Sequence, residues 1–133
     1  MEVLNIYKES LKRKWIDFNR RFGRLKTPMD IAILTLKSYG LWPHYPRALD
    51  VFGMYGLRIT ADYAPLCSQL ELWEINPLYA RYAKKFIPNA NVICGNSIEA
   101  IKSNTLQSDN YDLIVIDNPY GIFADGQYCE HFE

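Results

Sequence analysis

Polar and aromatic side chains follow one apolar run near the end of the chain. Residues 113–116 are bulky and apolar without alternation, which is typical of a strand buried on both faces of a parallel sheet. The next four residues are Asp117, Asn118, Pro119 and Tyr120. Ligands of open α/β sheets bind beyond the carboxyl ends of the strands, so this group predicts a site for a planar substrate. A plain strand followed by an Asn-Pro turn explains the same residues.

Similar groups follow three earlier segments that have strand character. The first segment ends at Asp50, and Gly53 and Gly56 follow it. Glycines let the backbone approach a ligand, and amides at the start of the next helix can hold an anion. The second segment ends at Glu74, where a carboxylate can accept two ribose hydroxyls. The third is followed by Asn96 and Ser97, whose polar groups could reach an adenine edge.

Strands and helices must alternate to position these groups. We expect strands near residues 48–52, 71–75, 91–94 and 113–116. We expect a short helix that ends before Pro65 and two further helices over residues 77–86 and 97–102. This order predicts an α/β fold, a Rossmann-like parallel sheet with helices on both faces, over residues 47–133. No repeat or flexible linker divides the chain, so a single domain is expected.

An N-terminal helical segment, residues 1–46, precedes this sheet. Apolar residues recur there at steps of three and four, which predicts a long helix with one apolar stripe. We expect this stripe to lie in the core or in an interface. Its members are Leu4, Tyr7, Leu11, Trp15, Phe18, Phe22 and Leu25. A second helix should begin after Thr27, with Pro28 in its first turn and Asp30 completing a capping box, and should end before Gly40.

The net charge of zero hides a segregation of charge. Residues 1–47 carry ten Lys or Arg against four Asp or Glu, and residues 48–133 carry five against eleven. Cations clustered on the first helix could bind a phosphate backbone, and the candidates are Lys12, Arg13, Arg20, Arg21 and Arg24. The structural alternative is an amphipathic helix laid on the domain with a solvated charged face.

Composition excludes several classes of protein. At 133 residues and 49% hydrophobic content, the chain can bury the core of one domain. Its apolar runs are too short for a membrane span or a signal peptide, so we expect a cytoplasmic protein without a membrane partner. Cys67, Cys94 and Cys129 lack CxxC spacing, and only Cys129 has a His nearby, His131. We therefore expect no disulfide framework and no metal site.

Residues 47–123 resemble the class I S-adenosylmethionine-dependent methyltransferases. Residues 48–56 look like their first motif, with Met54 at the first glycine position. Glu74 is similar to their ribose-binding acid, and Asn96 stands where they carry an Asp that contacts adenine. Residues 117–120 resemble the Asp/Asn-Pro-Pro-Tyr/Phe motif of enzymes that methylate amino or amide nitrogens, with Asn118 replacing the first proline.

The resemblance implies direct methyl transfer from S-adenosylmethionine to a nitrogen, with RNA or DNA as the expected substrate because the first helix is basic. Asp117 and the carbonyl of Asn118 would orient the amino group, and Tyr120 would stack on a base, which must leave a duplex to react. A catalytically silent domain that binds the cofactor or a partner is the alternative. An unrelated nucleotide-binding enzyme is a third possibility, but the chain lacks Gly-x-Gly-x-x-Gly and Gly-Lys-Ser/Thr.

The sheet of this family normally continues beyond its fourth strand. The resemblance therefore implies either a fragment of a longer methyltransferase or a minimal domain. In the second case we expect a partner or a second copy of the chain to cover the open sheet edge.

Overall fold

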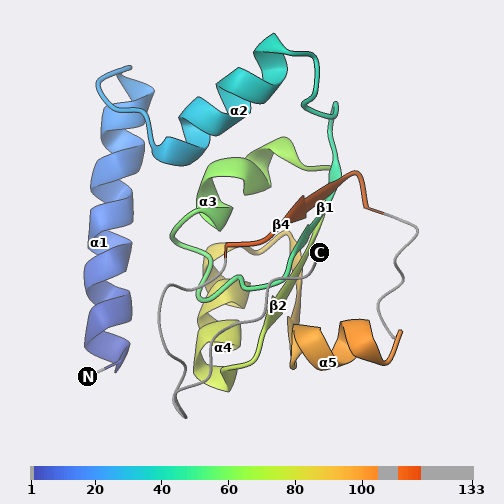
Figure 1. Ribbon diagram of the computed structural model, residues 1–133. Helices are drawn as coiled ribbons and strands as arrows, with labels where there is room; N and C mark the ends of the chain where they lie inside the picture. The colour runs from blue at the N-terminus through green and yellow to red at the C-terminus, as the bar shows by residue number, and fades with distance from the viewer. Residues whose placement is uncertain (1, 105–110, 118–133) are drawn as a thin grey trace.

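The computed structural model describes residues 2–104 and 111–117 (Figure 1). The helices are α1 (Glu2–Arg21), α2 (Pro28–Ser38), α3 (Thr60–Tyr63), α4 (Pro77–Phe86) and α5 (Ser97–Lys102), and a 3₁₀ turn, η1 (Ala64–Leu66), follows α3. The strands are β1 (Arg47–Asp50), β2 (Gln69–Glu74), β3 (Ala90–Cys94) and β4 (Leu113–Val115).

The four strands form one parallel sheet in the order β3-β2-β1-β4. Ala48 of β1 is in register with Leu70 of β2 and with Leu113 of β4. Successive strands are joined by helical connections, and the helices lie on both faces of the sheet (Figure 1). The predicted α/β, Rossmann-like fold is confirmed.

Two apolar layers fix the helices on the sheet. On one face, Leu72 and Val92 pack against Ala80 and Ala83 of α4. On the other face, Leu49 and Val51 pack against Ala100 of α5. Alanine at the helix contacts lets the helix backbones approach the strands closely, because it adds only one methyl group between them.

Helix starts follow the capping chemistry of the sequence. Thr27 and Asp30 form the predicted capping box at α2, with Pro28 as the first helical residue. Asn76 caps α4 by accepting hydrogen bonds from two backbone N–H groups, and Asn96 caps α5 in the same way. The predicted bounds 77–86 and 97–102 are confirmed, because these caps and Pro77 mark the starts locally.

The prediction that β4 is buried on both faces is wrong for the described residues. Ile114 is 55% exposed and Ile116 is 47% exposed. β4 is an edge strand, and Ile114 pairs with Leu49, so its side chain is on the sheet face that carries α5. Among the described residues, the core contacts of α5 are with Leu49 and Val51 near the neighbouring strand and do not include Ile114.

The apolar stripe of α1 is not part of the core. Its members from Leu4 to Phe22 are all exposed, whereas Ile6 and Arg13 are buried. Ile6 packs on Tyr55 and Leu57 of the loop after β1, so the first half of α1 lies beside that loop (Figure 1). Among the described helices, none has the length and apolar character needed to cross a bilayer.

Candidate functional site

Backbone hydrogen bonds join the carboxyl ends of the strands beyond the sheet itself. The Gly53 N–H donates to the Trp73 carbonyl at 3.0 Å, and the Gly95 N–H donates to the Glu74 carbonyl at 3.0 Å. The Val51 N–H donates to the Val115 carbonyl at 3.3 Å. The predicted groups that follow the four strands are therefore neighbours at one edge. Of the fourth group, Asn118, Pro119 and Tyr120 lie outside the described residues.

Asp50 is fully engaged by the protein. Its carboxylate accepts hydrogen bonds from the Thr60 hydroxyl at 2.7 Å, from the Phe52 N–H at 3.2 Å and from the Tyr63 hydroxyl. The side chain is buried, and burial raises the pKa of Asp50 above its usual range. Asp50 thus anchors the loop after β1 to α3, and no sequence pattern predicted Thr60 and Tyr63 as its partners.

The two glycines of this loop are required by packing. A Cβ on Gly53 would lie 2.2 Å from Cγ of Leu72, inside the core. Gly56 has φ of +75°, and a Cβ there would lie 2.7 Å from Cγ1 of Ile87. Between them, Met54 adopts φ of +46°, a conformation that is uncommon for residues other than glycine. The turn thus has a glycine-like backbone at Met54 as well.

Glu74 is a buried carboxylate at the end of β2. One oxygen accepts a hydrogen bond from the Asn76 N–H at 2.7 Å. Burial raises the pKa of Glu74, and the nearby Asp50 acts in the same direction. Within the described residues, no Lys or Arg forms an ion pair with Glu74. A buried carboxylate that forms no ion pair with a described residue can accept hydrogen bonds from neutral donors such as a pair of hydroxyl groups.

Asn96 and Ser97 follow β3 at the same edge. Ser97 is buried, and its hydroxyl donates to the Val51 carbonyl at 2.8 Å. Asn96 is exposed, and its Oδ1 accepts from the Ile98 and Glu99 N–H groups at 3.0 and 3.3 Å. Ser97 therefore fixes the third group against the first, while Asn96 stands at the surface of the site.

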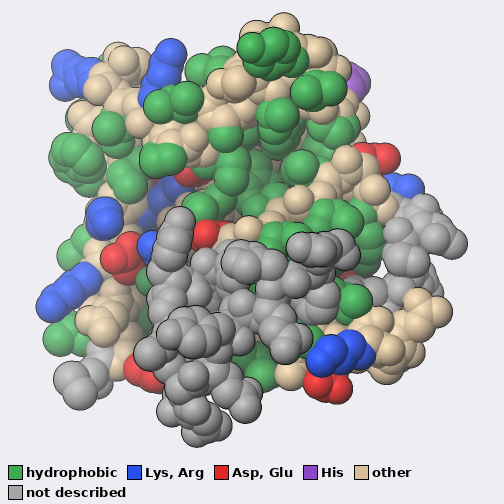
Figure 2. All heavy atoms as spheres, viewed as in Figure 1, with side chains coloured by type: hydrophobic (Ala, Val, Ile, Leu, Met, Phe, Trp, Pro, Cys, Tyr) green, Lys and Arg blue, Asp and Glu red, His purple; other side chains and the backbone are tan. Residues whose placement is uncertain are grey.

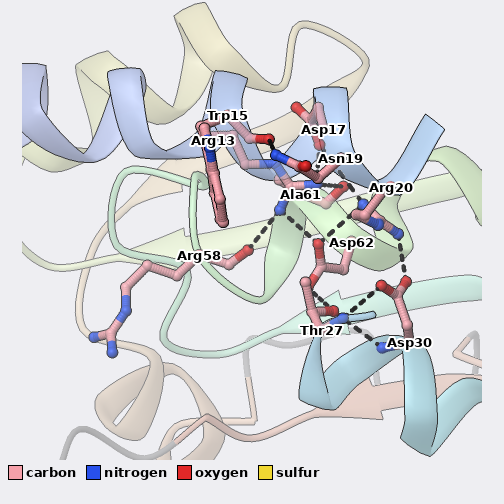
Figure 3. A network of polar contacts seen from close by, with 10 residues as sticks. All are labelled: Arg13, Trp15, Asp17, Asn19, Arg20, Thr27, Asp30, Arg58, Ala61 and Asp62. Carbon is pink, nitrogen blue, oxygen red and sulfur yellow. Dashed lines mark hydrogen bonds and ion pairs between the residues drawn. The ribbon is translucent and has the colours of Figure 1, made fainter. Parts of the chain in front are cut away.

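Arg13 and Arg20 of α1 belong to a network of polar contacts that faces α3 (Figure 3). Arg13 forms an ion pair with Asp62 at 2.5 Å, and Arg20 forms one with the same carboxylate oxygen at 3.2 Å. The second carboxylate oxygen of Asp62 accepts a hydrogen bond from the Thr27 hydroxyl at 2.8 Å. Arg20 also pairs with Asp30 of α2. Arg13 and Arg20 were predicted to contact the phosphates of a nucleic acid, but in the structure they pair with carboxylates of the protein itself.

The other predicted nucleic-acid ligands, Lys12, Arg21 and Arg24, are exposed. The guanidinium carbon of Arg24 lies 5.4 Å from the centre of the Phe22 ring, in a cation–π contact. Asp62 distinguishes the two sets of cations, because it pairs with Arg13 and Arg20 but not with the exposed Lys12, Arg21 and Arg24. Its position in a short helix after the glycine loop gave no signal of that role in the sequence.

A cavity of about 650 Å³ lies on one face of the sheet. It is lined by residues from the first positions of β1 and β2, including Arg47 and Gln69, and by Glu71, Trp73 and Tyr111. Trp73 donates to Glu71 at 2.7 Å, and burial together with Glu71 raises the pKa of Tyr111 to about 12. None of the residues predicted to bind the cofactor lines this cavity, so it is not the predicted cofactor site.

The fold and the carboxyl edge together define a Rossmann-like α/β domain with a glycine-containing loop after β1 and a buried acid as the last residue of β2. No family model matches the chain, and no curated protein matches its sequence. The fold is nevertheless shared with solved structures.

One similar structure is a TehB-like S-adenosylmethionine-dependent methyltransferase from Corynebacterium glutamicum. It has a TM-score of 0.50 and 17% identity, and the match covers 83% of this chain and 54% of that one. Another is the Thermoplasma acidophilum protein 1320, with a TM-score of 0.52 and 16% identity, covering 80% of this chain and 55% of that one. The chain thus spans about half the length of the solved structures it matches.

Proposed function

We propose that this chain is the cofactor-binding part of an S-adenosylmethionine-dependent methyltransferase that acts on an amino or amide nitrogen, with a nucleic-acid base as the substrate. The observation that carries the proposal is Glu74, a buried carboxylate at the carboxyl edge of the sheet, beside the glycine loop, that forms no ion pair with any described residue. The shared fold with a methyltransferase from Corynebacterium glutamicum supports it.

Each group at the carboxyl edge has a role in this proposal. Glu74 would accept hydrogen bonds from the ribose hydroxyls, and Asn96 would lie near the adenine. The loop from Gly53 to Gly56, held by Asp50, would support the methionine part. The cofactor would supply a methyl group on a sulfonium, so the protein needs no nucleophile of its own and mainly has to position the substrate.

Asp117 would position the substrate nitrogen. It follows β4 and is half-buried beside the other strand ends. A carboxylate there would accept a hydrogen bond from the amino group and direct the nitrogen lone pair, with Asn118, Pro119 and Tyr120 completing the substrate wall. The exposed cations Lys12, Arg21 and Arg24 support a polyanionic substrate.

A calorimetric titration with S-adenosylmethionine tests the cofactor assignment. Glu74→Ala should weaken binding by about 1.5–3 kcal/mol, the scale of hydrogen bonds to a charged group. Glu71→Ala is the matched control, because Glu71 lies on the same strand but bonds Trp73 and points into the separate cavity. Equal affinities of parent and Glu74→Ala would remove the ribose assignment.

A methyl-transfer assay then separates an enzyme from a silent binding domain. Asp117→Ala should abolish transfer to nucleic acid while cofactor affinity changes by only a few tenths of a kcal/mol, on the order expected when a group contacts substrate alone. A parent protein that binds the cofactor and transfers no methyl, with Asp117→Ala behaving like it, would leave the silent domain as the function.

A further inference from the structure

The outward side of α1 combines an apolar stripe with cations. Six members of the stripe are between 50% and 62% exposed: Leu4, Tyr7, Leu11, Trp15, Phe18 and Phe22. At about 100° per residue, they fall within about 80° of the helix circumference, opposite the buried Ile6 and Arg13. Four of the six are aromatic, and Figure 2 shows apolar and basic side chains interspersed along the edge of the molecule that α1 forms.

Charges on α1 are divided between its two sides. Lys8 and Lys12 flank one margin of the stripe, and Lys14 and Arg21 flank the other. All four are exposed, and none forms an ion pair with another described residue.

The acidic residues of the helix lie on the side of the domain. Asp17 pairs with Arg13. Burial raises the pKa of Tyr55 and of Tyr79, and the charges of Glu9 and Glu2 raise these two pKa values further. Because the exposed cations border the stripe while Glu2, Glu9 and Asp17 lie away from it around the helix, the outward surface of α1 is complementary to an anion.

From this arrangement we infer that α1 binds single-stranded nucleic acid, with bases on the aromatic stripe and phosphates on the flanking cations. Exposed rings interleaved with cations are the chemistry that binds unpaired strands without sequence preference. A duplex hides the faces of its bases and would leave the stripe in water. This inference rests on the proposed function, whose nucleic-acid substrate it narrows to unpaired strands.

Other occupants fit the surface less well. A second copy of the chain would bring the cations of one helix against the same cations of the other, and like charges in contact oppose association. A lipid surface favours a broad apolar face, whereas these six side chains cover only about 80° of the helix circumference. The position of α1 also suits a polymer, because Ile6 ties it to Tyr55 and Leu57 in the loop beside the cofactor site.

Fluorescence anisotropy of labelled 20-nucleotide strands tests the inference with the full chain. RNA and DNA of one mixed sequence are each measured as single strands and as duplexes, and the single strands should bind more tightly. Trp15→Ala and Phe18→Ala should each weaken single-strand binding at least about fivefold. Ile31→Ala is the matched control, because Ile31 is equally exposed on α2 and should leave binding unchanged.

The cations are tested through the salt dependence of binding. Replacing Lys14 and Arg21 by Gln together should lower the slope of log affinity against log salt by about 0.7 for each charge removed. Lys84→Gln with Lys85→Gln on α4 is the control pair, and it should leave the slope unchanged. The melting temperature of the ring variants should match that of the parent, because the rings are exposed.

Several results would overturn the inference. If duplex and single strand bind equally and the ring variants have no effect, α1 contacts only the phosphates of the nucleic acid, and the aromatic stripe takes no part in binding. Ring-dependent binding to phosphatidylserine vesicles but not to RNA or DNA would identify a membrane surface, and a ring-dependent dimer would identify a second copy. If the unmodified chain binds S-adenosylmethionine but no single strand, this inference alone is rejected. If it binds single strands but no S-adenosylmethionine, the cofactor assignment alone is rejected.

Discussion

Helices α1 and α4 are both amphipathic, but they turn opposite sides to the protein. α4 buries Ala80 and Ala83 on the sheet and exposes Lys84 and Lys85. α1 buries Arg13 and exposes its aromatic stripe. An apolar stripe therefore does not by itself decide which side of a helix packs. In α1 the side is selected by carboxylates on α3 and α2 that the arginines of α1 can reach.

The two helices differ in what a disruption should cost. α4 depends on close apolar contact, in which the free energy is spread over many atoms. The packing of α1 depends on a few charged groups. These groups lose their hydration when they are buried, and ion pairs and hydrogen bonds within the protein must compensate for that loss. Even so, one buried atom of this network, Nε of Arg13, has no hydrogen-bond partner among the described residues.

Removal of the shared carboxylate should have the largest effect. In Asp62→Ala, Arg13 stays buried without its 2.5 Å partner, and Arg20 and Thr27 lose contacts as well. We expect a loss of about 3–5 kcal/mol in the free energy of unfolding, measured by urea denaturation. Asp17→Ala is the control, since Asp17 is an exposed partner of the same Arg13, and it should cost at most about 1 kcal/mol. Similar losses for both would contradict the central role of Asp62.

Overpacking should have an intermediate effect on α4. Ala83 is fully buried against Leu72 and Val92, so Ala83→Leu should destabilise the protein by about 1–3 kcal/mol in the same measurement. The matched change on α1 is Trp15→Ala, which removes an exposed ring and should change stability by no more than about 0.5 kcal/mol. A large loss in Trp15→Ala would mean that the stripe packs against something in the folded chain.

The contact between α1 and α2 should have the smallest effect and a characteristic pH dependence. Burial tends to raise the pKa of Asp30, but hydrogen bonds from Thr27 and Arg20 outweigh it and hold the pKa below its usual value. A pKa lowered by folding stabilises the protein above the unfolded value of about 3.9, and this stability is lost as the pH falls through the lower folded value.

Asp30→Asn should therefore lower the free energy of unfolding by about 1 kcal/mol at neutral pH. It should also flatten the decline of stability below about pH 4. Acid titration followed by circular dichroism measures both. An unchanged acid limb in Asp30→Asn would show that other carboxylates control it.

Local signals in the sequence predicted most of the elements. Helix α4 could be placed to the residue because Asn76 and Pro77 fix its start within three positions of the chain. The capping box of Thr27 and Asp30 did the same for α2. The positions of Glu74 and Asn96 at strand ends could also be predicted, because a strand end is where an apolar run stops. Whether these residues bind a cofactor stays a prediction.

Three features required the tertiary structure. Asp50 lies at a strand end like Glu74, yet its oxygens are taken by Thr60 and Tyr63, which α3 brings to it. Ile114 belongs to an apolar run like that of a buried strand, yet β4 lies at the sheet edge. The direction of the α1 stripe depends on Asp62.

Sequence periodicity determined that α1 is an amphipathic helix, and capping residues determined where its neighbours begin. Only the fold determined which side of α1 is buried, because Asp62 is far from Arg13 in the sequence and meets it only when α3 packs beneath α1. Periodicity records the spacing of side chains along one element. The partner that each side chain meets depends on contacts between residues that are distant in the chain.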